Sequence, residues 1–267
     1  SGIYQRTTRG VRIYLATPRL RGLLAVTLAA AAASAMVIVN TVVIVRDELG
    51  LSQSAVALAL AGYGGGSMIA ALALPRLLDR LADRPVMLAA SGVLSLVLAV
   101  LAALAAALSG QALWMAMLFG WLVLGFAYSM SITPGGRLLR RSANPEDRPA
   151  LFAAQFALSH GCWLIAYPLA GWLGATFGQS AAFAAMAAFA FIGALLALSL
   201  LPRNDGEAVS HDHSDLPPDH PHLREGHAAG EPQHTFVIDD LHPRWPDRAW
   251  TGRWPPGTCW PWMAPAA

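Results

Sequence analysis

Six long blocks of apolar residues dominate this chain, and none of them contains Asp, Glu, Lys or Arg. A helix needs about 20 mostly apolar residues to cross the ~30 Å hydrocarbon core of a bilayer. Helices of a soluble core would each show a polar stripe, which these blocks lack. The sequence therefore predicts an all-α membrane protein with six transmembrane helices, over Leu23–Val45, Ser54–Leu74, Val86–Leu108, Ala112–Thr133, Leu151–Phe177 and Ser180–Leu201.

Arginine supplies the basic side chains of the loops, and its placement predicts the topology. Basic residues are in excess in cytoplasmic loops, and here they occupy every second loop, while the alternate loops hold only Arg46. We therefore expect a multi-pass protein of a bacterial inner membrane, surrounded by the lipid bilayer, with both termini in the cytoplasm. The arginines that indicate this orientation are Arg6, Arg9, Arg12, Arg19, Arg21, Arg76, Arg80, Arg84, Arg137, Arg140, Arg141, Arg148 and Arg203.

The chain divides into three regions by composition. Residues 1–21 form a basic cytoplasmic lead-in whose amphipathic part is expected to lie along the membrane interface. Residues 22–201 form the six-helix domain, and residues 202–267 form a His-, Pro- and Trp-rich tail that we expect to be disordered. The lead-in side chains expected to face lipid are Val11, Ile13, Tyr14 and Leu15.

Polar side chains are distributed unevenly among the six blocks. Blocks one, two, four and five carry them, whereas blocks three and six are almost purely apolar. Because a polar group that faces lipid costs several kcal/mol, the polar helices should share an interior and the plain helices should lie outside. The order polar, polar, plain occurs twice, as two inverted three-helix repeats would give. Gly64–Gly66 indicates close helix approach or bending.

Three segments carry a family resemblance. Asp47–Ser52 is similar to a short outer loop before a second helix. In the loop after the second block, Asp79 and Arg80 match the centre of the motif G-x-x-x-D-R-x-G-R-R/K and Arg84 matches its trailing basic residue, although both glycines are absent. Phe156–Gly174 is similar to a fifth helix. Over residues 10–202 the chain thus resembles the C-terminal half of a major facilitator superfamily transporter.

This resemblance implies a partner. A complete transporter of the superfamily has twelve helices and holds its substrate between two six-helix halves. The chain begins with Ser1 rather than Met, and we expect an N-terminal six-helix half to be missing from it. The resemblance extends to nickel-resistance exporters that end in His-rich tails.

Six polar residues inside the blocks are candidates for a substrate or proton pathway. His160 is the only imidazole within a block, and an ionisable group inside a bilayer is a functional candidate by default. It binds protons or touches substrate, or it is a neutral histidine bonded to a neighbouring helix. Asn40 and Tyr63 contact substrate or join helices to each other. The candidates are Asn40, Tyr63, Tyr128, Gln155, Ser159 and His160.

The loop after the second block is a candidate gate. Opposite charges at the edge of the membrane would lock one access state through ion pairs that break as the protein rearranges. Alternatively, the arginines hold the loop in the cytoplasm and the acids moderate their charge. The gate residues are Asp79, Arg80, Asp83 and Arg84.

The tail carries a candidate metal site. Imidazoles and carboxylates together suit Ni²⁺, Zn²⁺, Cu²⁺ or Co²⁺, and the absence of cysteine from the cluster argues against a closed structural zinc site. We expect loose, pH-dependent metal binding, or else a tail in which His merely accompanies Pro and Asp. No cofactor is required. The candidate ligands are His211, His213, His220, His222, His227, His234 and His242.

Two function classes remain. The first is an alternating-access carrier that exports a small solute or a divalent metal ion. The second is a membrane-anchored metal-binding or sensing module that acts through the tail. An enzyme is not expected: an intramembrane hydrolase would use Ser159 and His160, but these adjacent residues point about 100° apart on a helix. We also expect no nucleic-acid partner.

Overall fold

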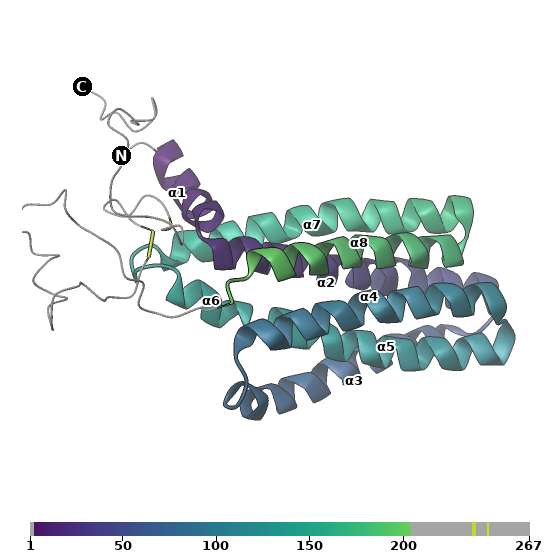
Figure 1. Ribbon diagram of the computed structural model, residues 1–267. Helices are drawn as coiled ribbons and strands as arrows, with labels where there is room; N and C mark the ends of the chain where they lie inside the picture. The colour runs from purple at the N-terminus through teal and green to yellow at the C-terminus, as the bar shows by residue number, and fades with distance from the viewer. Residues whose placement is uncertain (1–2, 204–236, 239–244, 246–267) are drawn as a thin grey trace, which may run out of the picture. The chain divides into compact units, whose positions relative to one another are not determined.

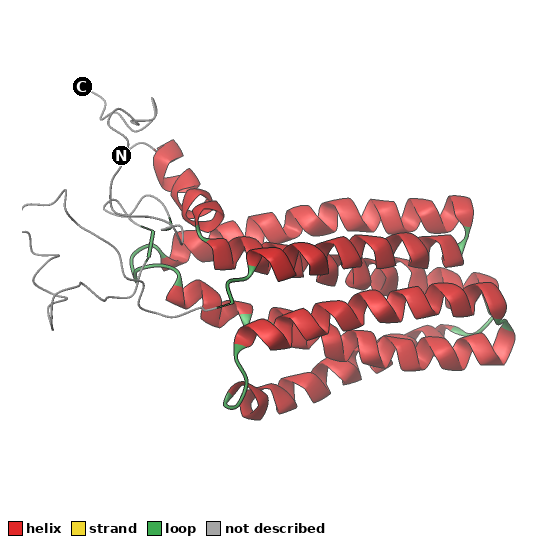
Figure 2. Cartoon of the chain, viewed as in Figure 1, coloured by secondary structure: helices red, strands yellow, loops and turns green. Residues whose placement is uncertain are grey.

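The computed structural model describes residues 3–203, 237–238 and 245, and every regular element among them is a helix (Figures 1 and 2). The chain divides into two units, Ser1–Asp205 and Gly206–Ala267, and the helices of the described residues belong to the first. The helices are α1 (Ile3–Ala16), α2 (Pro18–Val42), the π-helical continuation η1 (Val43–Glu48), α3 (Gln53–Leu78), α4 (Asp83–Ala107), α5 (Gly110–Ile132), α6 (Gly135–Arg141), α7 (Arg148–Phe177) and α8 (Gln179–Leu200).

The six predicted transmembrane helices are confirmed as elements. Six stretches are long and apolar enough to cross a membrane: Pro18–Glu48, Gln53–Leu78, Asp83–Ala107, Gly110–Arg141, Arg148–Phe177 and Gln179–Leu200. Several begin or end a turn beyond the apolar blocks, because backbone hydrogen bonding continues through the polar residues that flank a membrane span. The short helix α6 was not expected, since its seven residues contain three arginines and resemble a loop.

The lead-in helix α1 packs against protein rather than lipid. Ile13 and Tyr14 are buried, which contradicts the expectation that both face lipid, whereas Leu15 is exposed. At Gly10 the backbone of α1 approaches α7 so closely that an added Cβ would lie 2.1 Å from the Ala150 carbonyl oxygen. An amphipathic face needs apolar surroundings, and α7 supplies them as well as a bilayer would.

The most extensive helix pairings fit two inverted triplets, although the contacts of α7 with α8 and of α2 with α4 have no equally close counterpart between α3 and α4 or between α5 and α8. The first triplet is α2, α3 and α4, and the second is α5, α7 and α8. The equivalent helices are α2 and α5, α3 and α7, and α4 and α8. When they are exchanged, the packing of α3 on α5 corresponds to that of α7 on α2. The packing of α2 on α8 likewise corresponds to that of α5 on α4. The pairs α4–α8 and α2–α5 map onto themselves. This is the arrangement that a pseudo-twofold axis in the membrane plane produces.

Helix α2 lies at the centre of the unit. Of its most apolar window, 72% is buried, and the alanine run Ala29–Ala33 is wholly enclosed. Alanine leaves little space between helix axes, so neighbouring helices approach closely. Gly193 of α8 fits this surface, where a Cβ would lie 2.8 Å from the Ala29 nitrogen.

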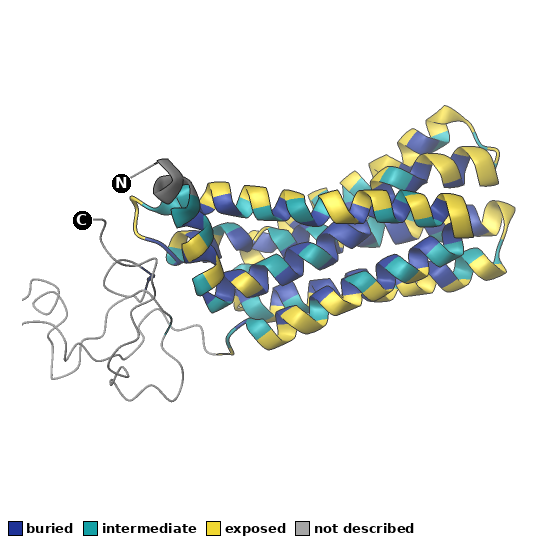
Figure 3. Cartoon of the chain, turned by 90° about the horizontal axis from the view of Figure 1, so that it is seen from above, coloured by how far each residue is buried: buried dark blue, intermediate teal, exposed yellow. Residues whose placement is uncertain are grey.

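The exposed surface falls mainly on α3 and α7, two of the helices that were expected to share an interior with other polar helices. Only 22% of the apolar window of α3 and 28% of that of α7 are buried, against 50% for α4 and 39% for α8 (Figure 3). The plain helices α4 and α8 pack on each other and on α5 and α2 respectively. Two helices that carry polar side chains therefore have the most uncovered surface.

The closest helix contact joins α3 to α5. A Cβ added at Gly66 would lie 1.9 Å from the Leu122 carbonyl oxygen, and one added at Gly125 would lie 1.9 Å from the Tyr63 carbonyl oxygen. Backbone therefore touches backbone at both places, as small residues permit in membrane helices. The close approach predicted for Gly64–Gly66 is confirmed for the third glycine, while Gly64 and Gly65 face open space.

Candidate functional site

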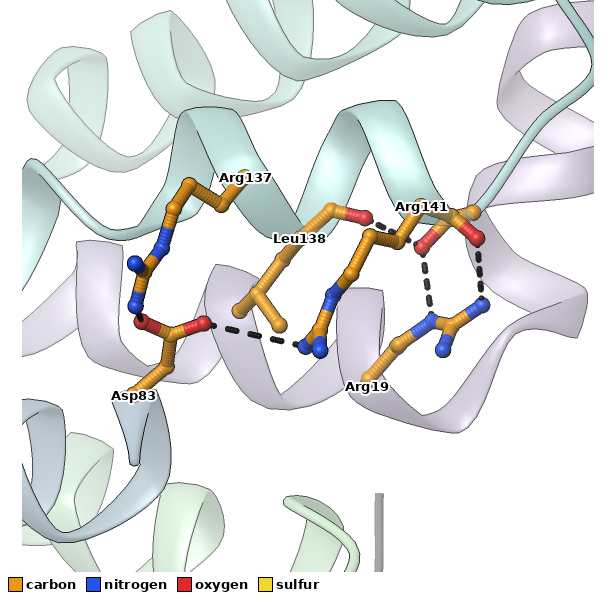
Figure 4. A network of polar contacts seen from close by, with 6 residues as sticks. Arg19, Asp83, Arg137, Leu138 and Arg141 are labelled. Atoms are coloured by element: carbon orange, nitrogen blue, oxygen red, sulfur yellow. Dashed lines mark hydrogen bonds and ion pairs between the residues drawn. The ribbon is translucent and has the colours of Figure 1, made fainter. Parts of the chain in front are cut away.

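One end of the bundle collects charged side chains; we call it the arginine-rich end. It comprises α1, α6, residues 79–82 and the last turn of α8. Figure 4 shows its centre, where Arg137 and Arg141 of α6 reach the carboxylate of Asp83 at the start of α4. The Arg141 Nη2–Asp83 Oδ2 distance is 3.7 Å. Because Asp83 is only 8% exposed, its charge is compensated mainly by these two guanidinium groups.

Arg19 fixes the other end of α6. It is 2% exposed, and its Nε donates to Ser142 Oγ at 2.8 Å while its Nη2 donates to the Arg141 carbonyl oxygen at 2.8 Å (Figure 4). The last carbonyls of a helix lack partners within it, and a cation there is favourable. Helix α6 is therefore held between α4, through Asp83, and α2, through Arg19.

Two further arginines join helices at this end. Arg84 Nε donates to the Leu201 carbonyl oxygen at 3.1 Å, which ties the start of α4 to the end of α8. Arg9 of α1 forms a two-point ion pair with Asp147, the residue before α7, at 2.6 Å and 3.0 Å. A paired planar fork of this kind is the stronger form of an arginine–carboxylate contact.

The four residues of the predicted gate loop fall into two pairs, one that makes contacts with other helices and one that is exposed. Asp83 and Arg84 make the contacts above, all within this chain. The side chains of Asp79 and Arg80 are exposed and make no hydrogen bond or ion pair with another described residue. The motif pair is thus the solvent-facing part of the loop, while its neighbours carry the contacts.

A tyrosine cluster lies near mid-length of the helices. The rings of Tyr63 on α3 and Tyr128 on α5 are 5.9 Å apart at 53°. A third tyrosine, Tyr167 of α7, is 36% exposed. Tyr63 Oη is buried and makes no well-aligned hydrogen bond with a described residue, and the Ser34 hydroxyl of α2 lies beside it. Of the three tyrosines, Tyr167 was not among the predicted site residues.

Asn40 and Gln155 make contacts between helices. Asn40 is 1% exposed and its Nδ2 donates to the Ala170 carbonyl oxygen at 3.3 Å, which joins α2 to α7. Gln155 Oε1 accepts a hydrogen bond from the Tyr14 hydroxyl of α1. Burial raises the pKa of Tyr14 far above its usual value, so the hydroxyl keeps its proton for this bond.

Ser159 and His160 share an acceptor rather than bonding each other. Ser159 Oγ donates to the Phe156 carbonyl oxygen at 2.8 Å, and His160 Nδ1 lies 2.7 Å from the same oxygen. The His160 ring is exposed, and its centroid lies 4.0 Å from that of Phe156 and 5.8 Å from that of Trp163, with the ring planes tilted by 34° and 59°. The Trp163 Nε1 atom is buried without a hydrogen-bond partner among the described residues.

The opposite end of the bundle is joined by uncharged groups. Ser180 Oγ of α8 donates to the Ala102 carbonyl oxygen of α4 at 2.8 Å. Glu48 and Gln179 line a small cavity there, whose other walls are apolar side chains. Gln179 Oε1 is buried and has no hydrogen bond within the described residues.

The seven histidines predicted to bind metal lie outside the described residues. Within the described part of the chain, no group of three or more His, Cys, Asp or Glu side chains is arranged to hold a metal ion. The candidate metal site of the tail therefore stays a prediction.

Comparison with known proteins gives one family. The sequence model of the Major Facilitator Superfamily matches residues 23–251, well over half of the chain. No curated protein and no solved structure gives a match.

Proposed function

Since this multi-pass membrane chain belongs to the major facilitator superfamily, a family of secondary transporters and not of enzymes, we propose that it is one six-helix half of an alternating-access carrier. The carrier exports a small solute or a divalent metal ion from a bacterial cell. The second half, an N-terminal six-helix unit, packs against the surface formed by α3 and α7.

The uncovered surface of α3 and α7 carries this proposal. These helices have the smallest buried share of the six spans, yet the polar side chains of His160 and Tyr167 are exposed on α7. Polar groups are costly against hydrocarbon, so a second protein unit or a water-filled path is the expected neighbour. The almost purely apolar helices α4 and α8 need no such cover.

The arginine-rich end is proposed to face the cytoplasm, in accordance with the positive-inside rule. Opening the two ends of the bundle should then require different amounts of free energy. Opening the cytoplasmic end requires α6 and its ion pairs to move as one piece with α2 and α4, because Asp83 and Arg19 join these three helices. The gate is thus proposed to be Asp83 and Arg84, with Asp79 and Arg80 as its solvent-facing flank.

A flux measurement tests the carrier. The full chain is placed in lipid vesicles, alone and together with a six-helix partner half, and solute uptake is followed under a proton gradient. Saturable flux that requires both halves supports the proposal. If the paired halves move neither organic solutes nor Ni²⁺ under any gradient, the carrier function is refuted.

A membrane-anchored metal sensor is the competing function, and the tail decides between the two. Deletion of residues 210–242 removes the seven candidate histidines. If the deleted chain still transports while Ni²⁺ binding by calorimetry disappears, the tail is an accessory to a carrier. Ni²⁺ binding that disappears from a protein without any flux favours the sensor.

A further inference from the structure

The small cavity at the end opposite the arginine-rich end is lined by two side chains that carry oxygen acceptors. They belong to Glu48 and Gln179, and the other lining side chains are apolar. The walls come from η1, α4, α5 and α8. The cavity therefore lies inside this six-helix unit, and its lining includes no described residue of α3 or α7, the helices proposed to meet the second half.

Gln179, at the start of α8, supplies a buried acceptor. Its side chain is 4% exposed, and its Oε1 makes no hydrogen bond with a described residue. The amides of Gln179 and Asn40 both lie against Gly174, where an added Cβ would lie 3.0 Å from Gln179 Nε2 and 2.7 Å from Asn40 Oδ1. Because Asn40 donates its own Nδ2 to a carbonyl of α7, its oxygen suits the Gln179 nitrogen, and Gln179 Oε1 is left without a donor. Proteins bury few such atoms.

Glu48 lies at the boundary between this cavity and water. It ends the π-helical turn Val43–Glu48 that continues α2, and it is exposed as well as lining the cavity. Arg46 and Asp47 are its charged neighbours on the same turn. Arg46 Nη1 donates to the Leu51 carbonyl oxygen, and the described residues show no ion pair between Arg46 and Glu48.

The helices around Glu48 bring no further charge to this end. Helices α5 and α8 contain no charged residue. Those of α2, α3 and α4 all lie at the arginine-rich end, and they are Arg19, Arg21, Arg76, Asp83 and Arg84. The ionisation of Glu48 is therefore not set by a fixed countercharge from a neighbouring helix.

Two acceptors beside one cavity require a ligand that donates. The cavity offers about 10 Å³ to water, which is enough for one water molecule and far too little for an organic solute. Two side chains also supply too few oxygens for Mg²⁺ or Ca²⁺, which bind six or more ligands. A proton meets the requirement, because protonation turns a carboxylate from an acceptor into a donor.

We propose that Glu48 and Gln179 form a proton-binding site that fastens this end of the unit. A proton from the adjoining water binds a carboxylate oxygen of Glu48, and the resulting O–H donates to Gln179 Oε1, directly or through one water molecule in the cavity. The bond joins η1 to α8, which Ser180 already joins to α4. Release of the proton restores the carboxylate and removes the bond. The inference goes beyond the carrier function and does not depend on it, because it concerns helix contacts within one half.

Thermal unfolding of the full chain in detergent, between about pH 4 and about pH 8, tests the site. Only the folded protein offers the protonated carboxyl this acceptor, so the stabilisation is present at low pH and is lost as the pH rises. Glu48→Gln supplies a permanent N–H donor. The melting temperature of the wild type, relative to that of Glu48→Gln, should fall by about 2–4 °C as the pH rises, the value of one hydrogen bond. Parallel pH profiles of the two proteins overturn the proposal.

Two further variants assign the effect to this pair. Asp47→Asn removes the neighbouring acid, which does not line the cavity, and its pH profile should stay parallel to that of the wild type. In a Gln179→Leu background, which lacks the acceptor, the added substitution Glu48→Gln should no longer change the pH profile. A full effect of Glu48→Gln in that background overturns the role of Gln179.

Access to the cavity tests whether the proton fastens this end. Ala105→Cys places a thiol on the cavity wall, and Ser109→Cys, in the exposed loop after α4, reports how pH alters the thiol reaction itself. The ratio of maleimide labelling at position 105 to that at position 109 should fall about fivefold from high to low pH, the value of one hydrogen bond. Glu48→Gln should keep the ratio low throughout. A ratio that does not change with pH while Glu48 is intact overturns the fastening.

Discussion

At the arginine-rich end, charged side chains reach from helix to helix, whereas the opposite end is joined by neutral side chains that donate to backbone carbonyls. Arg19 and Asp83 contact α6 from two sides, while Ser180 and Asn40 each make one bond to a neighbouring helix. Neutral bonds between membrane helices contribute modestly. The two ends of this unit should therefore differ in how much free energy is needed to separate their helices.

The difference suggests a division of labour. A charged network at the membrane edge is strong while its members stay paired and dry, and it is weakened as soon as water enters. An end of this kind is suited to a closure that opens in one cooperative step. An end joined by neutral hydrogen bonds is expected to open gradually, one bond at a time. The following substitutions test this contrast, from the largest expected effect to the smallest.

Asp83→Asn should have the largest effect. The substitution leaves two guanidinium groups, of Arg137 and Arg141, facing a neutral group in place of a carboxylate that is only 8% exposed. We expect a loss of about 2 kcal/mol in stability, since two charge-assisted contacts to one buried carboxylate are weakened together. Thermal unfolding in detergent measures it. Asp79→Asn, in the exposed part of the same loop, should change stability by less than about 0.5 kcal/mol. If the two substitutions lower stability equally, Asp83 does not contribute to the network.

Arg19→Met should follow, with a loss of about 1–2 kcal/mol. Methionine keeps the apolar stem but leaves Ser142 Oγ and the Arg141 carbonyl without their donor. A double-mutant cycle with Asp83→Asn measures the coupling through α6. Strict additivity of the two losses would mean that α6 is not the connection between them.

Arg9→Gln should cost about 0.5–1 kcal/mol, because the Arg9 side chain is 39% exposed and water weakens its pair with Asp147. The pair is accessible to ions, so the loss should shrink in high salt. Unfolding temperatures at low and high salt give the measurement. A loss that is independent of salt would indicate that packing of α1 on α7, rather than charge, is responsible.

Ser180→Ala, at the opposite end, should have the smallest effect, about 0.5 kcal/mol. It removes the one bond from Ser180 Oγ to the Ala102 carbonyl oxygen. The packing of α8 on α4 does not depend on this bond alone. If this change destabilises the protein as much as Asp83→Asn does, the contrast between the two ends is wrong.

The sequence was sufficient for the spans and for their grouping into triplets, because length and apolarity alone decide what crosses a bilayer. It was insufficient for Tyr14, since an amphipathic face has the same pattern whether lipid or protein covers it. Asp83 and Arg84 were recognised as charged, but their partners Arg137 and Leu201 lie far along the chain, and only tertiary packing brings them near. Trp163 was missed because an unpartnered indole N–H is a property of surroundings and not of residue type.

The contact at Gly66 and Gly125 has a mechanical consequence. Because the backbones of α3 and α5 touch there, the two helices cannot slide past or rotate against each other without a collision of main-chain atoms. Apolar packing and this contact join α3 to its neighbours, and together they determine its path. We therefore expect α3 and α5 to move together as one rigid body. Any motion that α5 acquires from α6 at the arginine-rich end is transmitted to Tyr63 at mid-length, without a single charged residue between them.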